Sequence, residues 1–99
     1  MQHSLVWSEE ASAIMDDLER DPTYARKCRK IKKAAAQLQV NPRHPGLHTH
    51  PYSSLRGPGG EVVYEAYVEN RTPSAWRIWY WYGPDRGVIT ILTVGPHPD

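Results

Sequence analysis

The hydrophobic pattern of this 99-residue chain changes its period once, near residue 41. Before that point apolar residues recur every three or four positions, which is the spacing of one face of an α-helix. Segments 62–69, 75–82 and 88–94 are short and rich in Val, Ile, Tyr and Trp, which favours β-strands. Helices followed by strands, in a chain of one-domain length, predict an α+β fold. We therefore expect a single domain, residues 1–99, in which two antiparallel N-terminal helices pack on a small twisted, mainly antiparallel β-sheet.

Local signals set the expected ends of the two helices. Ser8 can cap the first helix, and Asp21 followed by Pro22 can begin the second. Asn41 precedes a proline, which disfavours the helical conformation, so the second helix should end there. Leu5–Trp7 can form an N-terminal strand. The apolar stripes expected in the two helices are Ala11, Ile14, Met15 and Leu18, and then Tyr24, Cys28, Ile31, Ala35 and Leu38.

The segment from residue 42 to residue 60 is rich in proline and glycine and shows no hydrophobic period. We expect a long loop, and long ordered loops in compact domains are often functional. His44, His48 and His50 lie close together in it. Three imidazoles could bind zinc, but no cysteine pair or helical His-Glu-x-x-His accompanies them, so turn chemistry is the favoured interpretation. No cofactor is expected.

Charge is unevenly distributed, although the formal net charge is only +1. Residues 1–20 carry a net charge of −4, residues 21–43 a net +6, and residues 44–99 a net −1. The basic block could attract an acidic protein or a phosphate backbone, and a solvated helix face is an equally weighted alternative. The candidate nucleic-acid contacts are Lys30, Lys32, Lys33 and Arg43, with His50 and Arg56 farther along the chain.

The single cysteine, Cys28, cannot form an internal disulfide, and its place in an apolar stripe favours a core position. A reducing, cytoplasmic location is the simplest expectation. No apolar run approaches the roughly 20 residues of a membrane span, so no membrane partner is expected. The N-terminal residues lack the basic and long apolar regions of a signal peptide.

The segment 75–82 carries candidate binding residues on one side of a strand. Period two places Arg77, Trp79 and Trp81 on one face, and the opposite face should cover the helices. An arginine beside open tryptophan rings can bind phosphates and stack on bases, each stack being worth about 1–3 kcal/mol. A core position or a partner contact is the favoured alternative for the two tryptophans.

Two residues are candidates for proton transfer. His97 follows the last strand in the sequence Gly-Pro-His-Pro. Imidazole titrates near neutral pH, so His97 could act as a general acid or base in phosphodiester cleavage. Glu65 could supply a carboxylate base, although an exposed strand glutamate commonly serves solubility or protects an edge.

Several motifs, taken in order, resemble those of the RelE/ParE superfamily of bacterial toxins. Val6–Ala11 resembles the family's first strand running into its first helix, and Ile31–Leu47 resembles the end of its second helix and the following loop. Leu55–Gly57 resembles the Leu-x-Gly step before the sheet. Trp76–Ile78 resembles the strand that carries an arginine, and Ile91–His97 resembles the closing strand. The resemblance spans nearly the whole chain.

The resemblance implies a type II toxin of the RelE, YoeB and HigB kind, which is a metal-independent endoribonuclease that cuts mRNA on the ribosome and so inhibits translation. It assigns Arg77 to stabilise the scissile phosphate and His97 to transfer a proton. It also implies a cognate antitoxin, an acidic segment that wraps the sheet and helices. A DNA gyrase inhibitor of the ParE branch and a non-catalytic interaction module with the same fold are the alternatives.

Overall fold

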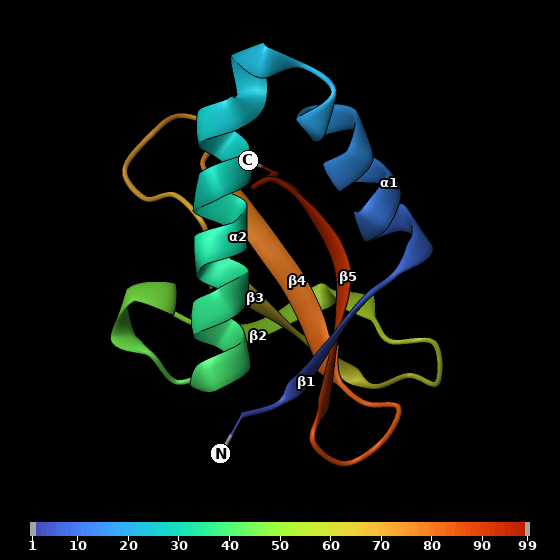
Figure 1. The fold of residues 1–99 in the computed structure, drawn as a ribbon. Helices are drawn as coiled ribbons and strands as arrows, with labels where there is room; N and C mark the ends of the chain where they lie inside the picture. The colour runs from blue at the N-terminus through green and yellow to red at the C-terminus, as the bar shows by residue number, and fades with distance from the viewer. Residues whose placement is uncertain (1, 99) are drawn as a thin grey trace.

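The computed structural model describes residues 2–98 and places two helices on one face of a five-stranded sheet (Figure 1). In chain order the elements, with η for a 3-10 helix, are β1 (Ser4–Trp7), α1 (Glu9–Glu19), η1 (Pro22–Tyr24), α2 (Ala25–Val40), η2 (Pro45–Leu47), β2 (His50–Arg56), β3 (Val62–Tyr67), β4 (Trp76–Tyr82) and β5 (Val88–Pro96). The α+β class predicted from the sequence is confirmed.

The sheet is mixed and has the strand order β1-β5-β4-β3-β2. Strand β1 runs parallel to β5, whereas β2, β3, β4 and β5 pair antiparallel in succession. The expectation of a mainly antiparallel sheet is therefore confirmed, with one parallel pair added. Because β1 lies beside β5, segments from the two ends of the chain lie side by side (Figure 1).

Two polar side chains begin the helical segments where the sequence predicted. The Ser8 hydroxyl accepts the Ala11 N–H at 3.0 Å and donates to the Leu92 carbonyl oxygen at 2.6 Å, so it begins α1 and ties it to β5. Asp21 Oδ1 accepts the Thr23 N–H at 2.9 Å, and η1 then leads directly into α2. Such caps satisfy backbone donors that have no partner within the first helical turn.

The main core lies between the helices and the sheet. Ile31 and Leu38 of α2 are fully buried, as are Ile78 of β4 and Ile91 of β5. The predicted apolar stripes are therefore largely confirmed. Tyr24 is the exception and is 42% exposed, because it lies in η1, where the 3.6-residue period of α2 does not apply.

The expected long loop between residues 42 and 60 is wrong, because this segment contains η2 and strand β2. Strand β2 lies at the edge of the sheet and pairs with β3, and its register shifts between Pro51 and Arg56. Proline is tolerated in an edge strand, where one side of the backbone needs no ladder donors. The irregular pairing and the mostly exposed side chains give β2 no apolar alternation, so its sequence carries no strand signal.

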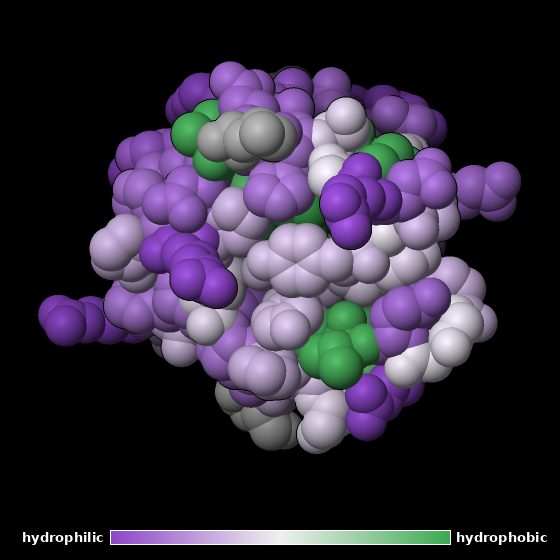
Figure 2. All heavy atoms as spheres, turned by 90° about the horizontal axis from the view of Figure 1, so that it is seen from below, coloured by the Kyte–Doolittle hydropathy of each residue, from purple (hydrophilic) through white to green (hydrophobic). Residues whose placement is uncertain are grey.

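Apolar side chains on the surface are scattered. Val6, Val40 and Val62 are each at least 45% exposed. Seen from below, the molecule is mainly hydrophilic, and its apolar residues form small patches separated by polar ones (Figure 2). Single exposed apolar residues of this kind are normal for a folded protein. Within residues 2–98, no helix combines the length and the apolar composition needed to cross a membrane.

Candidate active site

The face of the sheet that points away from the helices carries a second, smaller core. Its buried members are Val63, Trp79 and Trp81, against which Tyr52, Leu55 and Leu92 pack. The two tryptophans lie on the face that period two predicted, but they are only 5% and 6% exposed. The two rings are therefore not open for stacking on bases, and they take the core position that was the favoured alternative. Strand β2, which the sequence did not predict, supplies Tyr52 and Leu55 as part of their cover.

Glu65, on the same face, is a buried carboxylate that is only 1% exposed. In the register of the sheet it lies between His50 of β2 and Trp79 of β4. Cross-strand neighbours of this kind have Cβ atoms about 4.5–5.5 Å apart, close enough for their side chains to touch. A carboxylate at this depth requires compensating charge and hydrogen bonds. Glu65 is therefore not a solubilising residue on an exposed strand surface.

Four nitrogen atoms surround the Glu65 carboxylate. Oε1 lies 3.3 Å from His50 Nε2 and 3.4 Å from Arg77 Nε. Oε2 accepts a hydrogen bond from Trp79 Nε1 at 3.1 Å and lies 3.5 Å from His97 Nε2. We call these five residues the Glu65 cluster. The structure thus brings together the three residues predicted to be catalytic, Arg77, His97 and Glu65, with two that were predicted to bind nucleic acid.

The two histidines are the accessible members of the Glu65 cluster. The side chain of His97 is 37% exposed and that of His50 is 47% exposed. The His97 backbone N–H donates to the Ala75 carbonyl oxygen at 2.9 Å, which ties the segment after β5 to the start of β4. His50 Nδ1 lies 2.8 Å from the His48 carbonyl oxygen, so both ring nitrogens of His50 face oxygen atoms.

Arg77 is 8% exposed, and its guanidinium is bound inside the protein. Nη1 donates to the carbonyl oxygens of Glu69 and Trp76. The guanidinium carbon lies 3.6 Å from the centre of the Tyr67 ring, a cation–π contact. Nε has no hydrogen-bond partner among the described residues and faces Glu65. Little of Arg77 is therefore open for the direct phosphate contact that the resemblance implies.

Glu69 connects this region to α2. Its carboxylate lies 2.7 Å from Lys27 Nζ and 3.2 Å from Lys30 Nζ, and it accepts the Trp76 N–H at 3.1 Å. Burial opposes ionisation of this carboxyl, but the bonds from Lys27, the Trp76 N–H and Lys30 outweigh burial, so the pKa of Glu69 is lowered from its ordinary value. Lys30, one of the lysines predicted to contact RNA, is thus partly neutralised.

The lysines predicted to bind nucleic acid lie on two different sides of α2. Lys30 and Lys33 line a hollow of about 340 Å³ that also reaches Tyr67, at the end of β3. Because the Tyr67 ring contacts Arg77, this hollow adjoins the Glu65 cluster. These two lysines therefore lie on the side of α2 that faces Tyr67.

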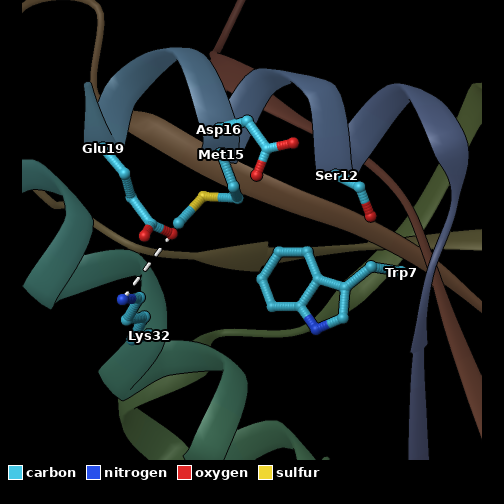
Figure 3. Close-up of a pocket in the computed structure, with 6 residues that line it drawn as sticks. All are labelled: Trp7, Ser12, Met15, Asp16, Glu19 and Lys32. Carbon is cyan, nitrogen blue, oxygen red and sulfur yellow. Dashed lines mark ion pairs between the residues drawn. The ribbon is translucent and has the colours of Figure 1, made fainter. Parts of the chain in front are cut away.

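Lys32 borders a separate hollow of about 360 Å³ between α1 and α2. Figure 3 shows its ammonium directed at the Glu19 carboxylate, with the Trp7 indole on the other side of the hollow. The Lys32 and Glu19 groups are 3.6 Å apart, and both are well exposed. Of the three lysines predicted as a group, Lys32 is the one that does not face the side of Tyr67.

The remaining candidate residues lie around the η2–β2 segment. Arg43 borders a hollow of about 380 Å³ with His50, and Arg56 is exposed at the end of β2. His44 Nδ1 accepts the Gly46 N–H at 3.0 Å and so caps η2, as turn chemistry predicted. In the range 2–98, no group of three or more His, Cys, Asp and Glu side chains is arranged to hold a metal ion.

Sequence reasoning missed two aromatic residues of the site. The Tyr67 ring contacts the Arg77 guanidinium and has its centre 4.9 Å from that of the His48 ring. The Tyr52 ring has its centre 5.6 Å from that of Trp79 and 6.4 Å from that of His97. The alternation along β3 puts Tyr67 on the face of Glu65, so the pattern could have identified it. No sequence pattern pointed to Tyr52, because β2 lacks the alternation of apolar and polar residues that identifies a strand.

No protein-family model matches the sequence, and no curated protein matches it. Solved structures do match. A YoeB/ParE toxin from Agrobacterium tumefaciens has a TM-score of 0.69 at 16% identity, over 96% of this chain and 99% of that chain. A chain of the archaeal RelE–RelB complex from Pyrococcus horikoshii has a TM-score of 0.63 at 19% identity, over 97% and 96%. The YoeB dimer from Staphylococcus aureus matches with a TM-score of 0.61 at 14% identity, over 99% of this chain and 100% of that chain.

These matches cover almost the whole of both chains in each case, so they compare complete domains rather than a local motif. At such low sequence identities the property they share is the fold. The same toxins are those whose motifs the sequence resembles in order, from the first strand to the closing one. The chain therefore has the fold of the RelE/ParE toxin superfamily.

Proposed function

We propose that this protein is the toxin of a type II toxin–antitoxin pair, a metal-independent endoribonuclease that cuts mRNA on the ribosome. The observation that carries the proposal is the Glu65 cluster, in which one buried carboxylate lies beside two accessible imidazoles and a guanidinium. The fold shared with YoeB and RelE toxins supports it. Such a cluster can supply proton transfer and positive charge, which are the two requirements of RNA cleavage.

The proposed reaction is attack by a ribose 2′-hydroxyl on the neighbouring phosphate. The 2′-oxygen forms a bond to phosphorus while the bond from phosphorus to the 5′-oxygen of the next nucleotide breaks. The products are a 2′,3′-cyclic phosphate and a 5′-hydroxyl, so one proton must leave the 2′-hydroxyl and one must reach the 5′-oxygen. A positioned general acid or base contributes about 10²–10⁴-fold to such a rate.

In this scheme His97 exchanges a proton with the RNA, and Glu65 is a positioning residue. A carboxylate next to one ring nitrogen fixes the orientation of the imidazole and the tautomer that it presents. Glu65 is too deeply buried to touch the substrate itself. We therefore replace the general-base role expected from the sequence with this indirect one.

Arg77 places a permanent positive charge near the reacting phosphate, and the His50 imidazole can donate a hydrogen bond to it. In a site with little water, fixed charges stabilise developing negative charge more strongly than they do in bulk solvent. His50 is the more exposed of the two and can approach the phosphate directly, whereas Arg77 acts mainly by offsetting the charge of Glu65.

The test is primer extension on a reporter mRNA in a reconstituted translation system. Adding the protein should create new ends within the translated region. His97→Gln should remove these ends, while Tyr24→Leu, at an exposed residue of η1, should leave them unchanged. Circular dichroism must show that both variants are folded. New ends that persist in folded His97→Gln would overturn the assignment of the proton-transfer residue.

One observation favours a second candidate function, a non-catalytic binder with the same fold, such as a DNA gyrase inhibitor of the ParE kind. Groups inside the protein already occupy much of the cluster: Glu65 has four nitrogen neighbours, and Arg77 Nη1 is bonded to two carbonyl oxygens. Intact mRNA in the test above would select this alternative. A gyrase supercoiling assay would then separate an inhibitor from an interaction module.

We also propose a cognate antitoxin as partner. One structural relative was solved as a RelE–RelB complex. In this chain the exposed side of α2 carries Arg26, Arg29 and Lys33, which would attract an acidic segment. The Trp79 and Trp81 rings need no such cover, because they are already buried. Binding of an acidic partner to α2 should weaken as salt concentration rises.

A further inference from the structure

Tyr67, the last residue of β3, contacts two parts of the chain that carry members of the Glu65 cluster. In the register of the sheet it lies opposite Arg77, and its ring centre is 3.6 Å from the guanidinium carbon. The same ring centre lies 4.9 Å from that of His48 and 6.2 Å from that of His50, which it meets edge-on. One half-buried ring therefore packs both on the arginine and on the segment that carries His50.

The Arg77 guanidinium has few other contacts that fix its direction. Its Nη1 donates to the carbonyl oxygens of Glu69 and Trp76. Its Nε lies 3.4 Å from Glu65 Oε1 but forms no hydrogen bond with any group in residues 2–98. Hydrogen bonds from one nitrogen leave the guanidinium plane free to turn about that atom, and an ion pair without a hydrogen bond has little angular preference. The Tyr67 ring is therefore the contact that sets the plane of the guanidinium.

The direction of the His50 ring depends on the same tyrosine, through His48. The His48 carbonyl oxygen lies 2.8 Å from His50 Nδ1. His48 has a φ of 47°, in the left-handed region that residues with a side chain seldom adopt. A backbone conformation of this kind persists only where the surrounding structure holds it. By packing on the His48 ring, Tyr67 holds the carbonyl group that the exposed His50 ring faces.

We propose that Tyr67 is a positioning residue of the reaction site. Its ring sets the plane of the Arg77 guanidinium and, through His48, the direction of the His50 imidazole. This inference rests on the proposed ribonuclease function, in which Arg77 and His50 act on the reacting phosphate. Tyr67 itself touches no reacting atom. A displacement of about 1 Å in a reacting arrangement can lower a rate about 100-fold, so the loss of this one ring should slow the reaction strongly.

A second tyrosine of the same strand shows what a purely packing role looks like. Tyr64 points to the helix-covered face, where its ring centre lies 5.7 Å from that of Tyr80 and 5.5 Å from that of Tyr82. Its ring neighbours are thus aromatic side chains of the core. The ring neighbours of Tyr67 are a guanidinium and two imidazoles. Attraction between a cation and a ring face is strongest where water is excluded, and Arg77 is almost fully buried.

The test is single-turnover cleavage of an mRNA bound to the ribosome, measured over a range of protein concentrations and expressed per folded molecule. Tyr67→Leu removes the ring and keeps an apolar side chain. It should lower the maximal rate about 10- to 100-fold and leave the concentration for half-maximal rate unchanged. Tyr67→Phe keeps the ring face and should restore the wild-type rate. Tyr64→Leu is the matched control, which should lose stability in urea unfolding but keep the wild-type rate.

Three results would overturn the proposal. A wild-type maximal rate in Tyr67→Leu would mean that the ring only packs. A change confined to the concentration for half-maximal rate would make Tyr67 a binding residue rather than a positioning one. A rate in Tyr67→Phe as low as that in Tyr67→Leu would assign the effect to the hydroxyl group instead of the ring.

An NMR measurement separates this inference from the proposed function, because it needs no RNA. The rate at which the Arg77 Nε–H exchanges with water should rise several-fold in Tyr67→Leu and stay unchanged in Tyr67→Phe and Tyr64→Leu. If the wild-type protein cuts no mRNA, the nuclease fails, and faster exchange in Tyr67→Leu still shows that the ring holds the guanidinium. If the wild type cuts mRNA while Tyr67→Leu changes neither the rate nor the exchange, the nuclease stands and the role of Tyr67 is refuted.

Discussion

The two faces of the sheet differ in what they bury. The helix-covered face is closed by apolar side chains from both layers, such as Ile31 and Leu38 against Ile78. The opposite face has a smaller apolar cluster and, beside it, the Glu65 carboxylate with its histidines and arginine. The first face stabilises the fold mainly through buried apolar area. The second keeps charge away from water, which costs free energy unless each group is paired.

This difference indicates where function resides. Replacing a buried ion pair by apolar residues of similar volume is often neutral or stabilising, so a charged cluster is not the simplest way to fill one face of a small domain. Its confinement to the helix-free face argues for a role in binding or chemistry. Changes made on one face at a time should separate stability from activity.

The largest loss of stability is expected from Leu38→Ala on the helix-covered face. Leu38 is fully buried, and the cavity left by its truncation should cost about 3–4 kcal/mol of unfolding free energy. Urea unfolding measures this loss. The rate of mRNA cleavage per folded molecule should stay at the wild-type value. A selective loss of cleavage by folded Leu38→Ala would mean that the two faces are not independent.

Arg77→Ala on the opposite face should cost about 3 kcal/mol, because Glu65 would lose its permanently charged partner. Unlike Leu38→Ala, it should also abolish cleavage by the molecules that remain folded. Urea unfolding measures the loss of stability, and a cleavage assay on the folded fraction measures the loss of activity.

A double variant is the control for that result. Arg77→Met combined with Glu65→Gln removes both charges, and it should recover much of the stability but none of the cleavage. Recovery of cleavage together with stability would show that the pair serves only to hold the fold.

A smaller effect is expected at Glu69, which joins β3 to α2. Its pKa is lowered in the folded state, so the unfolded chain binds more protons as pH falls. Its stabilising contribution is fully present above the ordinary value of 4.5 and is lost as pH falls through the lowered folded value. Glu69→Gln should lower the unfolding free energy by about 1 kcal/mol near neutral pH. It should also make that free energy fall less steeply as the solution becomes acidic. Urea unfolding over a pH series measures both, and an unchanged acid slope would refute the contacts with Lys27 and Lys30.

The smallest effect is expected from single lysines of α2. Lys33 borders the hollow beside Tyr67, whereas Lys32 faces Glu19 on the other side. In fluorescence anisotropy with an RNA oligonucleotide, Lys33→Ala should weaken binding a few-fold and reduce the salt slope by about 1. Lys32→Ala should change neither. Equal effects of the two variants would mean that the whole basic helix contacts RNA.

Local patterns predicted the helix-covered face well. The cap at Ser8 and the buried stripe through Ile31 follow from rules that act within a few residues. Period two also placed Arg77 correctly on the face opposite the helices. Each of these features depends on one segment of sequence and its own hydrophobic period.

The site could be predicted only in part, because it is built from long-range pairings. Strand β2 has no apolar alternation, so its pairing with β3 and the resulting contact of His50 with Glu65 left no trace in the sequence. The same omission left the cover over Trp79 and Trp81 unidentified, because part of it comes from β2. Edge strands that contain proline and pair in an irregular register form because of tertiary contacts rather than because of the β-propensity of their residues.

The decisive measurement is the single-turnover rate of mRNA cleavage by Glu65→Gln. Glutamine keeps the shape of the side chain and removes its charge. The comparison is with a helix-face variant such as Ile31→Val, adjusted by urea to the same fraction folded. If the Glu65 cluster is the reaction site, Glu65→Gln should cut about 100-fold more slowly, while Ile31→Val keeps the wild-type rate. Cleavage by Glu65→Gln at the wild-type rate would show that the chemistry lies elsewhere.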